Sequence, residues 1–208
     1  MSEYHKIETL YERDEATHRL KPELTLKNRV YGIIKTWYWT EKIDGTNIRA
    51  IWQGGKLSFG GKTDNASIPA DLVKWLYENI TPEKLAACFP DGGDVVIYGE
   101  GYGAGIQRGG LYGPTKKFIV FDVLIDEWWL KCKDIEDVCA SLGLDTVPFL
   151  AETTIDKACR FVAYGQMKSV LGEAPAEGVV GRPAVEVRDR RGRRVITKIK
   201  AVDYAHLQ

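Results

Sequence analysis

At residues 41–47 the chain reads Glu-Lys-Ile-Asp-Gly-Thr-Asn, between two runs in which bulky and polar residues alternate. The run at 36–40 leads into this stretch and the run at 48–52 leads out of it, and both have the period of a β-strand. We therefore expect two strands joined by a short turn, with Gly45 supplying the bend. Lys42 lies in this aromatic stretch and is expected to be largely buried. Burial lowers the pKa of a lysine and makes the amine a nucleophile near neutral pH, whereas a solvated lysine on a strand face is the alternative.

The order Lys-x-Asp-Gly at 42–45 resembles motif I of the covalent nucleotidyltransferases, which comprise ATP-dependent RNA and DNA ligases and GTP-dependent mRNA capping enzymes. In that superfamily the lysine attacks the α-phosphate of a nucleoside triphosphate and forms a lysyl-NMP intermediate. The resemblance implies that Lys42 is the nucleophile and that Glu41 and Lys42 help to bind the nucleotide. Further motifs of the family follow in the same order along the chain.

Two apolar runs downstream read as buried strands and carry the next motifs. The run at 94–101 ends in Gly-Glu-Gly, and the resemblance implies that Glu100 contacts the ribose of the nucleotide. The run at 117–125 is similar to motif III, in which an aromatic ring stacks on the purine. We assign this stacking to Phe121, with Phe118 as the alternative, because the period of two does not decide which ring faces the nucleotide.

The stretch Glu-Gly-Val-Val at 177–180 resembles motif IV, whose glutamate serves the divalent metal. The resemblance thus implies Glu177, with Asp44 as a second candidate, as ligands of Mg²⁺ or Mn²⁺. The outgoing arm of a hairpin expected over 184–200 is similar to motif V, and its period of two places Lys198 and Lys200 on one face. Two parallel ammonium groups suit phosphate binding, and a solvated strand edge is the alternative.

Asn47 distinguishes the members of the superfamily. DNA ligases and capping enzymes usually carry arginine five residues after the nucleophile, whereas asparagine resembles the RNA ligases that seal nicks in duplex RNA. Asp44 is the choice of DNA ligases, and Lys62 looks similar to a basic residue that contacts the nucleotide or the RNA end. We expect an ATP-dependent RNA ligase that acts on 5′-phosphate and 3′-hydroxyl ends in duplex or bridged RNA. The alternatives are a minimal DNA ligase, an inactive nucleic-acid-binding module and a capping guanylyltransferase.

The bulk composition limits where the protein acts and how it binds nucleic acid. The 208 residues include 29 basic and 29 acidic ones, so any basic surface must be local. No apolar run is long enough to span a membrane, and no signal peptide precedes the first motif. The four cysteines form no CxxC pair and are expected to be reduced. We expect a cytoplasmic monomer with no membrane association.

The fold implied by the resemblance is of the α+β class, with two antiparallel sheets around a nucleotide cleft and helices outside. We expect one minimal nucleotidyltransferase domain over 1–208, without a C-terminal OB-fold or helical domain, because eight residues follow Lys200. Helical spacing and capping residues predict helices over 69–80, from Thr81 onward, over 134–142 and over 154–168.

Overall fold

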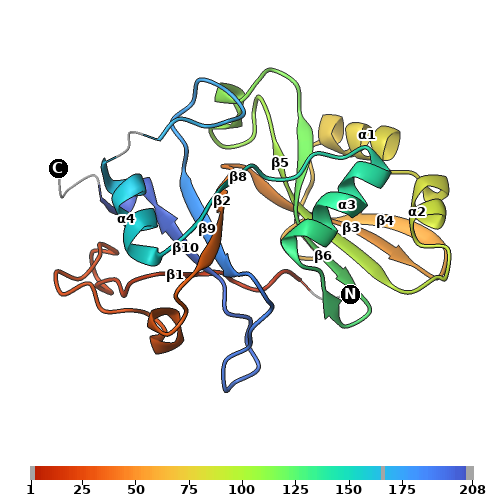
Figure 1. The fold of residues 1–208 in the computed structure, drawn as a ribbon. Helices are drawn as coiled ribbons and strands as arrows, with labels where there is room; N and C mark the ends of the chain where they lie inside the picture. The colour runs from red at the N-terminus through yellow and green to blue at the C-terminus, as the bar shows by residue number, and fades with distance from the viewer. Residues whose placement is uncertain (1–2, 165–166, 205–208) are drawn as a thin grey trace. The chain divides into compact units, whose positions relative to one another are not determined.

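The computed structural model describes residues 3–164 and 167–204, and the chain divides into two compact units (Figure 1). Unit 1 consists of residues 1–5 and 44–147, and unit 2 consists of residues 6–43 and 148–208. Each unit is built on one five-stranded sheet, so the expected α+β class with two sheets is confirmed. The expectation of a single domain over 1–208 stays a prediction.

The sheet of unit 1 is antiparallel throughout and has the strand order β4-β3-β5-β6-β7. Its strands are β3 (Thr46–Gln53), β4 (Lys56–Gly60), β5 (Val95–Tyr102), β6 (Lys117–Ile125) and β7 (Trp128–Trp129). Gly54 and Gly55 both have positive φ and close the two-residue turn between β3 and β4. The short 3₁₀ helix η2 (Gly109–Leu111) lies in the glycine-rich segment between β5 and β6.

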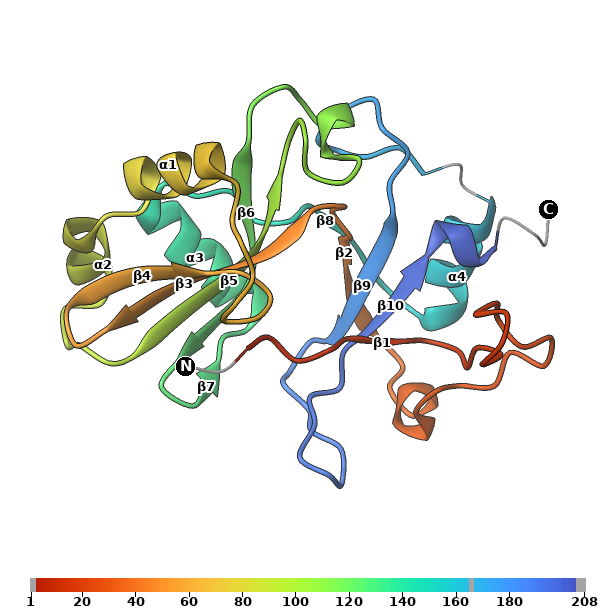
Figure 2. The ribbon, with the colours of Figure 1, turned by 180° about the vertical axis from the view of Figure 1, so that it is seen from behind.

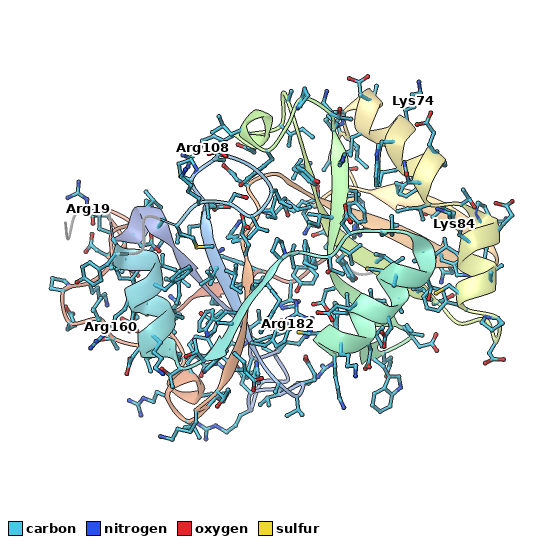
Figure 3. The ribbon with its side chains drawn as sticks, turned by 45° about the horizontal axis from the view of Figure 1, so that its top comes forward. Arg19, Lys74, Lys84, Arg108, Arg160 and Arg182 are labelled. Atoms are coloured by element: carbon cyan, nitrogen blue, oxygen red, sulfur yellow. The ribbon has the colours of Figure 1, made fainter. Side chains whose placement is uncertain are left out.

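Three helices cover one face of this sheet, as Figure 2 shows from behind. They are α1 (Ala70–Asn79), α2 (Pro82–Cys88) and α3 (Cys132–Leu142), close to the predicted ranges. Thr81 caps α2 and Gly143 ends α3 in the left-handed conformation, as their residue types favour. Lys84, labelled in Figure 3, donates to the carbonyls of Asn79 and Leu142 and so ties α2 to the ends of α1 and α3.

The sheet of unit 2 has the strand order β1-β10-β9-β2-β8 and is antiparallel except for the two-residue strand β1. Its strands are β1 (Glu8–Thr9), β2 (Trp37–Glu41), β8 (Phe149–Thr153), β9 (Gly178–Pro183) and β10 (Thr197–Lys200). Helix α4 (Ile155–Tyr164) packs on one face, where Ala158 and Val162 share a core with Trp39, Val179 and Ile199. The 3₁₀ helices η1 (Arg29–Gly32) and η3 (Ala201–Asp203) complete this unit.

The prediction that the strands within 37–52 pair as a hairpin is wrong. β2 pairs with β8 and β9, whereas β3 pairs with β4 and β5, so the two strands belong to different sheets and different units. Gly45 has no positive φ, and its role is a close approach: an added Cβ would lie 2.2 Å from the carbonyl oxygen of Gly101. The residue is therefore needed for space rather than for a bend.

The hairpin expected over 184–200 and the helix expected over 154–168 have other bounds in the structure. The incoming strand near the C-terminus is β9 at Gly178–Pro183, while residues 184–196 form an irregular arm with one bridge between Arg188 and Arg194. Helix α4 ends at Tyr164; the predicted continuation through 165–166 lies outside the described residues, and Lys168 is not helical. Within the described residues, no helix is long and apolar enough to cross a membrane.

Candidate active site

Unit 2 brings four charged side chains together on one face of its sheet. Lys42 directly follows β2 and donates its backbone N–H to the carbonyl of Gly178, the first residue of β9. Glu177 directly precedes β9, and Lys200 is the cross-strand partner of Gly178. Lys198 lies two residues back on β10, so it shares the face of Lys200. These four residues, Lys42, Glu177, Lys198 and Lys200, are called the lysine cluster below.

Glu177 is the centre of the lysine cluster. Its Oε2 atom lies 2.5 Å from Nζ of Lys42, and its Oε1 atom lies 2.6 Å from Nζ of Lys200. Burial acts to raise the pKa of this carboxyl group, but the two ammonium groups outweigh it and lower the pKa below its usual range. Glu177 is therefore ionised at neutral pH and fixes the position of the Lys42 amine.

Lys198 carries the unbalanced charge of the cluster. Burial and the neighbouring charges of Lys200 and Lys42 lower its pKa to about 8, and the attraction of Glu177 only partly opposes them. Three lysines around one carboxylate leave the face with excess positive charge at neutral pH. Such a face stabilises an incoming anion.

The side chain of Glu41 lies on the opposite face of the same sheet. Glu41 and Trp39 are paired with Val179 and Gly181, so Glu41 points with Trp39 toward the core and is 1% exposed. Its Oε2 atom accepts a hydrogen bond of 2.9 Å from the N–H of Val170, and its Oε1 atom has no partner among the described residues. The side chain of Glu41 thus faces away from the lysine cluster, and its predicted contact with the nucleotide stays a prediction.

The lysine cluster offers one carboxylate, that of Glu177, as a ligand for a divalent metal. No group of three or more His, Cys, Asp or Glu side chains in the described part of the chain is arranged to hold a metal. Mg²⁺ commonly binds through one or two carboxylates together with substrate phosphates and water, so Glu177 fits such a partial site once a phosphate displaces a lysine from it. The metal roles of Glu177 and Asp44 stay predictions.

In unit 1, Asn47 and Glu100 lie directly opposite each other on the neighbouring strands β3 and β5. They point away from the helices, because Ile48 and Ile97 of the same strands lie in the helix-covered core. The Oδ1 atom of Asn47 is buried and has no hydrogen-bond partner among the described residues. A buried polar atom without a partner carries a free-energy cost, and a ligand donor would remove it.

A β-bulge in β6 separates the two candidate rings. Val120 pairs with Gly99 and Asp122 pairs with Tyr98, so Phe121 is the extra residue. Phe118 is 1% exposed and lies in the core against Gly99, where an added Cβ would meet its ring at 2.4 Å. Phe121 lies on the other face and contacts Tyr4, whose ring centroid is 4.9 Å away.

Tyr4 is a residue of this face that the sequence did not reveal. Its hydroxyl donates to Oδ2 of the buried Asp122 at 2.8 Å, and its ring also packs on Tyr98 and Trp129. These contacts place Tyr4 beside Phe121. Residues 3–5 carry no recognisable motif, so no sequence signal pointed to this contact.

The glycine-rich segment between β5 and β6 contacts Asp44 within unit 1. Nε of Arg108, labelled in Figure 3, lies 3.3 Å from Oδ2 of Asp44. The hydroxyl of Tyr112 accepts a hydrogen bond of 3.0 Å from the N–H of Asp44. The segment thus folds over the start of β3.

Lys62 is exposed on a loop that Arg49 holds in place. Arg49 is 1% exposed; its Nε donates to the carbonyl of Gly61 at 3.0 Å, and its guanidinium lies 2.7 Å from Asp64. In the sequence, the only sign of this contact is that Arg49 is a charged residue within an alternating strand. Lys62 is therefore carried by a fixed loop, and its predicted contact with nucleotide or RNA stays a prediction.

A family model described as RNA ligase matches residues 35–200. No curated protein is significantly similar in sequence. Solved structures of a Naegleria gruberi RNA ligase share the fold. One mutant with ATP and Mn has a TM-score of 0.65 and 18% identity, covering 97% of this chain and 60% of that chain. A second has a TM-score of 0.69 and 16% identity, covering 100% and 58%.

The same ligase solved with PPi has a TM-score of 0.64 and 16% identity, covering 99% of this chain and 64% of that chain. The present chain thus spans about three fifths of the length of these relatives. At such identities the likeness shows the fold.

Proposed function

The chain belongs to the RNA ligase family, and we propose that it is an ATP-dependent RNA ligase. It would join a 3′-hydroxyl to a 5′-phosphate of RNA through lysyl-AMP and RNA-adenylate intermediates. The observation that carries this proposal is the lysine cluster, in which one carboxylate fixes the amine of Lys42 within an otherwise cationic face. Solved relatives with ATP, AMP and Mn support ATP as the nucleotide and Mg²⁺ or Mn²⁺ as the metal.

In the first step, Nζ of Lys42 attacks the α-phosphorus of ATP, an N–P bond forms and pyrophosphate leaves. The attacking amine must be neutral, so Lys42 gives up a proton to solvent before it attacks. Glu177 accepts its hydrogen bond and orients the amine. Lys198 and Lys200 stabilise the negative charge that develops on the phosphate oxygens. A divalent metal bound with help from Glu177 would supply further charge stabilisation on the phosphates.

Residues of unit 1 would hold the nucleoside. We assign stacking of the adenine to Phe121, because Phe118 is buried in the core. Glu100 would accept a hydrogen bond from the ribose. The orphaned Oδ1 of Asn47, on the strand beside Glu100, supports a ligand contact at this face.

In the later steps AMP passes from Lys42 to the RNA 5′-phosphate, and a 3′-hydroxyl then attacks this phosphorus and releases AMP. Asn47 and Lys62 would help to place the phosphates. The exposed ammonium of Lys62 acts as a point charge on a phosphate, without the two-pronged geometry of arginine. DNA in place of RNA is the alternative substrate, which Asp44 favours and Asn47 disfavours.

The test of this function is an intact-mass measurement after incubation with Mg²⁺ and either ATP or GTP. We expect wild type to gain the mass of one AMP from ATP only, Lys42→Ala to gain none, and the exposed-lysine control Lys157→Ala to gain as much as wild type. The starting mass reveals any protein that was already adenylated. An adduct on Lys42→Ala would overturn the mechanism, and faster sealing of all-DNA than all-RNA nicks would assign the DNA alternative.

A further inference from the structure

The net charge of zero conceals a separation of charge between the two units. Unit 2 contains 19 lysines and arginines against 13 acidic residues, a net charge of +6, whereas unit 1 contains 10 against 16, a net charge of −6. Five arginines of unit 2 lie within the arm at 184–196. A local excess of this kind is the electrostatic footprint of a nucleic-acid surface, which the total charge does not reveal.

Three of the five arginines of this arm are already engaged. Arg194 makes a two-pronged contact with Glu186 at 2.6 and 3.0 Å, and Arg193 pairs with Asp189 at 2.8 Å. Arg188 donates to the carbonyl of Gly192 at 3.3 Å. Carboxylates within the arm therefore balance two of its five arginine charges, and Arg188 is held by a neutral carbonyl.

Arg190 and Arg191 differ from these three. Both lie at the turn of the arm, both are exposed, and neither side chain has a hydrogen bond or ion pair among the described residues. The turn is fixed, because the Asp189 carboxylate accepts the backbone N–H groups of Arg191 and Arg193, at 2.8 and 3.0 Å. The arm thus presents two uncompensated guanidinium groups on an ordered turn.

The arm is continuous with the strands that carry the lysine cluster. It extends from the ends of β9 and β10, as both ribbon views show (Figures 1 and 2). Glu177 and Lys200 lie at the other end of these strands, and the six residues of β9 span about 20 Å. A nucleic acid whose end is held at the lysine cluster would reach the turn only with phosphates several nucleotides away.

We propose that Arg190 and Arg191 bind backbone phosphates of the RNA substrate, several nucleotides from the end that is joined. This inference rests on the proposed function and adds a surface outside the reacting site. The contact is to phosphate rather than to bases, because two exposed side chains on a turn neutralise charge without entering a groove. It supplies affinity for long RNA without any part in self-adenylation.

The test is RNA affinity as a function of salt for wild type and the double variant Arg190→Ser/Arg191→Ser. Anisotropy with a nicked RNA duplex that extends well beyond the joined ends measures the slope of log K against log salt. Each lost phosphate contact reduces this slope by roughly 0.7 to 0.9, so we expect a reduction of about 1.4 to 1.8. From 50 to 200 mM salt, wild type then loses about tenfold more affinity than the variant.

The matched control is Lys157→Ser/Arg160→Ser, which removes the same charge from exposed positions of α4; Arg160 is labelled in Figure 3. We expect its salt slope to equal that of wild type, because α4 covers the face opposite the lysine cluster. Arg190→Lys/Arg191→Lys should keep the wild-type slope, since a point charge suffices for phosphate. An equal loss of slope in the α4 control, or an unchanged slope in the serine variant, would overturn the proposal.

Two further readouts locate the contact and separate it from catalysis. With a short RNA duplex that ends close to the nick, wild type and the serine variant should bind with the same slope, and a persisting difference would contradict the assigned distance. The serine variant should gain AMP at the wild-type rate. A protein that binds RNA as expected but never gains AMP would disprove the ligase function while leaving this surface intact.

Discussion

Lys198 is the residue whose charge responds most directly to an anion. Its pKa of about 8 in the free protein means that close to half of the molecules carry a neutral Lys198 at pH 8. A bound anion favours the ammonium form and raises this pKa, so binding must take up protons near pH 8 and little at pH 6. We predict that sulfate binds more weakly as the pH rises through 8.

Calorimetry in two buffers with different ionisation enthalpies measures this uptake, with sulfate as a probe that does not itself titrate. We expect up to about half a proton per site at pH 8, in accordance with the shifted pKa. The uptake should disappear in Lys198→Met and persist in the control Lys157→Met on α4. The same uptake in wild type and Lys198→Met would show that another group binds the proton.

At the scale of elements, residue patterns predicted the strands and helices but not the partners of the strands. Alternation identified β2 and β3 correctly as strands, yet they lie in different sheets. Pairing depends on residues far away in the sequence, such as Val179 of β9 for β2 and Gly99 of β5 for β3. The shared face of Lys198 and Lys200 was predictable, because β10 is regular. Glu177 could be placed in the cluster only through the resemblance.

The assignment of the stacking ring to Phe118 or Phe121 shows, within the single strand β6, that the residue pattern does not fix which face a side chain occupies. A strict period of two would put Phe118, Val120 and Asp122 on one face of β6. The bulge at Phe121 reverses the alternation, so Val120 and Val123 lie in the core while Asp122 points away from it. No residue type in this strand predicts a bulge, so the sequence left both rings as candidates for stacking on the purine.

The close approach of β3 and β5 gives a prediction about Gly45. In Gly45→Ala the methyl group would lie 2.2 Å from the carbonyl of Gly101 and 2.9 Å from Cγ of Glu100, so the start of β3 must move. We expect a loss of stability of about 1–3 kcal/mol, typical of overpacking, together with a large loss of AMP transfer to Lys42. Thermal unfolding and the intact-mass measurement test both effects.

The matched control for this prediction is Gly54→Asn. Gly54 has a φ of +54°, nothing lies within 4 Å of its added Cβ, and asparagine tolerates the left-handed conformation. This variant should keep the wild-type melting temperature and AMP transfer. If Gly45→Ala is as stable and as active as Gly54→Asn, the close approach does not constrain motif I.

At the scale of the whole molecule, the position of the charges rather than their sum should decide the affinity for RNA. The sequence pI is about 6.8, so the chain is net negative at pH 8, yet basic residues outnumber acidic ones in unit 2. We predict that RNA still binds at pH 8 in low salt. With about four phosphate contacts, affinity should fall roughly a hundredfold from 50 to 200 mM salt.

Two variants with the same net charge separate the effect of charge position from the effect of total charge. Arg190→Ser/Arg191→Ser and Lys56→Ser/Lys74→Ser each remove two positive charges, the first from unit 2 and the second from exposed positions of unit 1. If charge position decides, only the first variant reduces the salt slope at pH 8, because unit 1 is already net negative and neither Lys56 nor Lys74 is part of the proposed RNA surface. Equal reductions in both variants would mean that RNA responds to the total charge. An affinity that does not change with salt would remove phosphate binding as the basis of recognition.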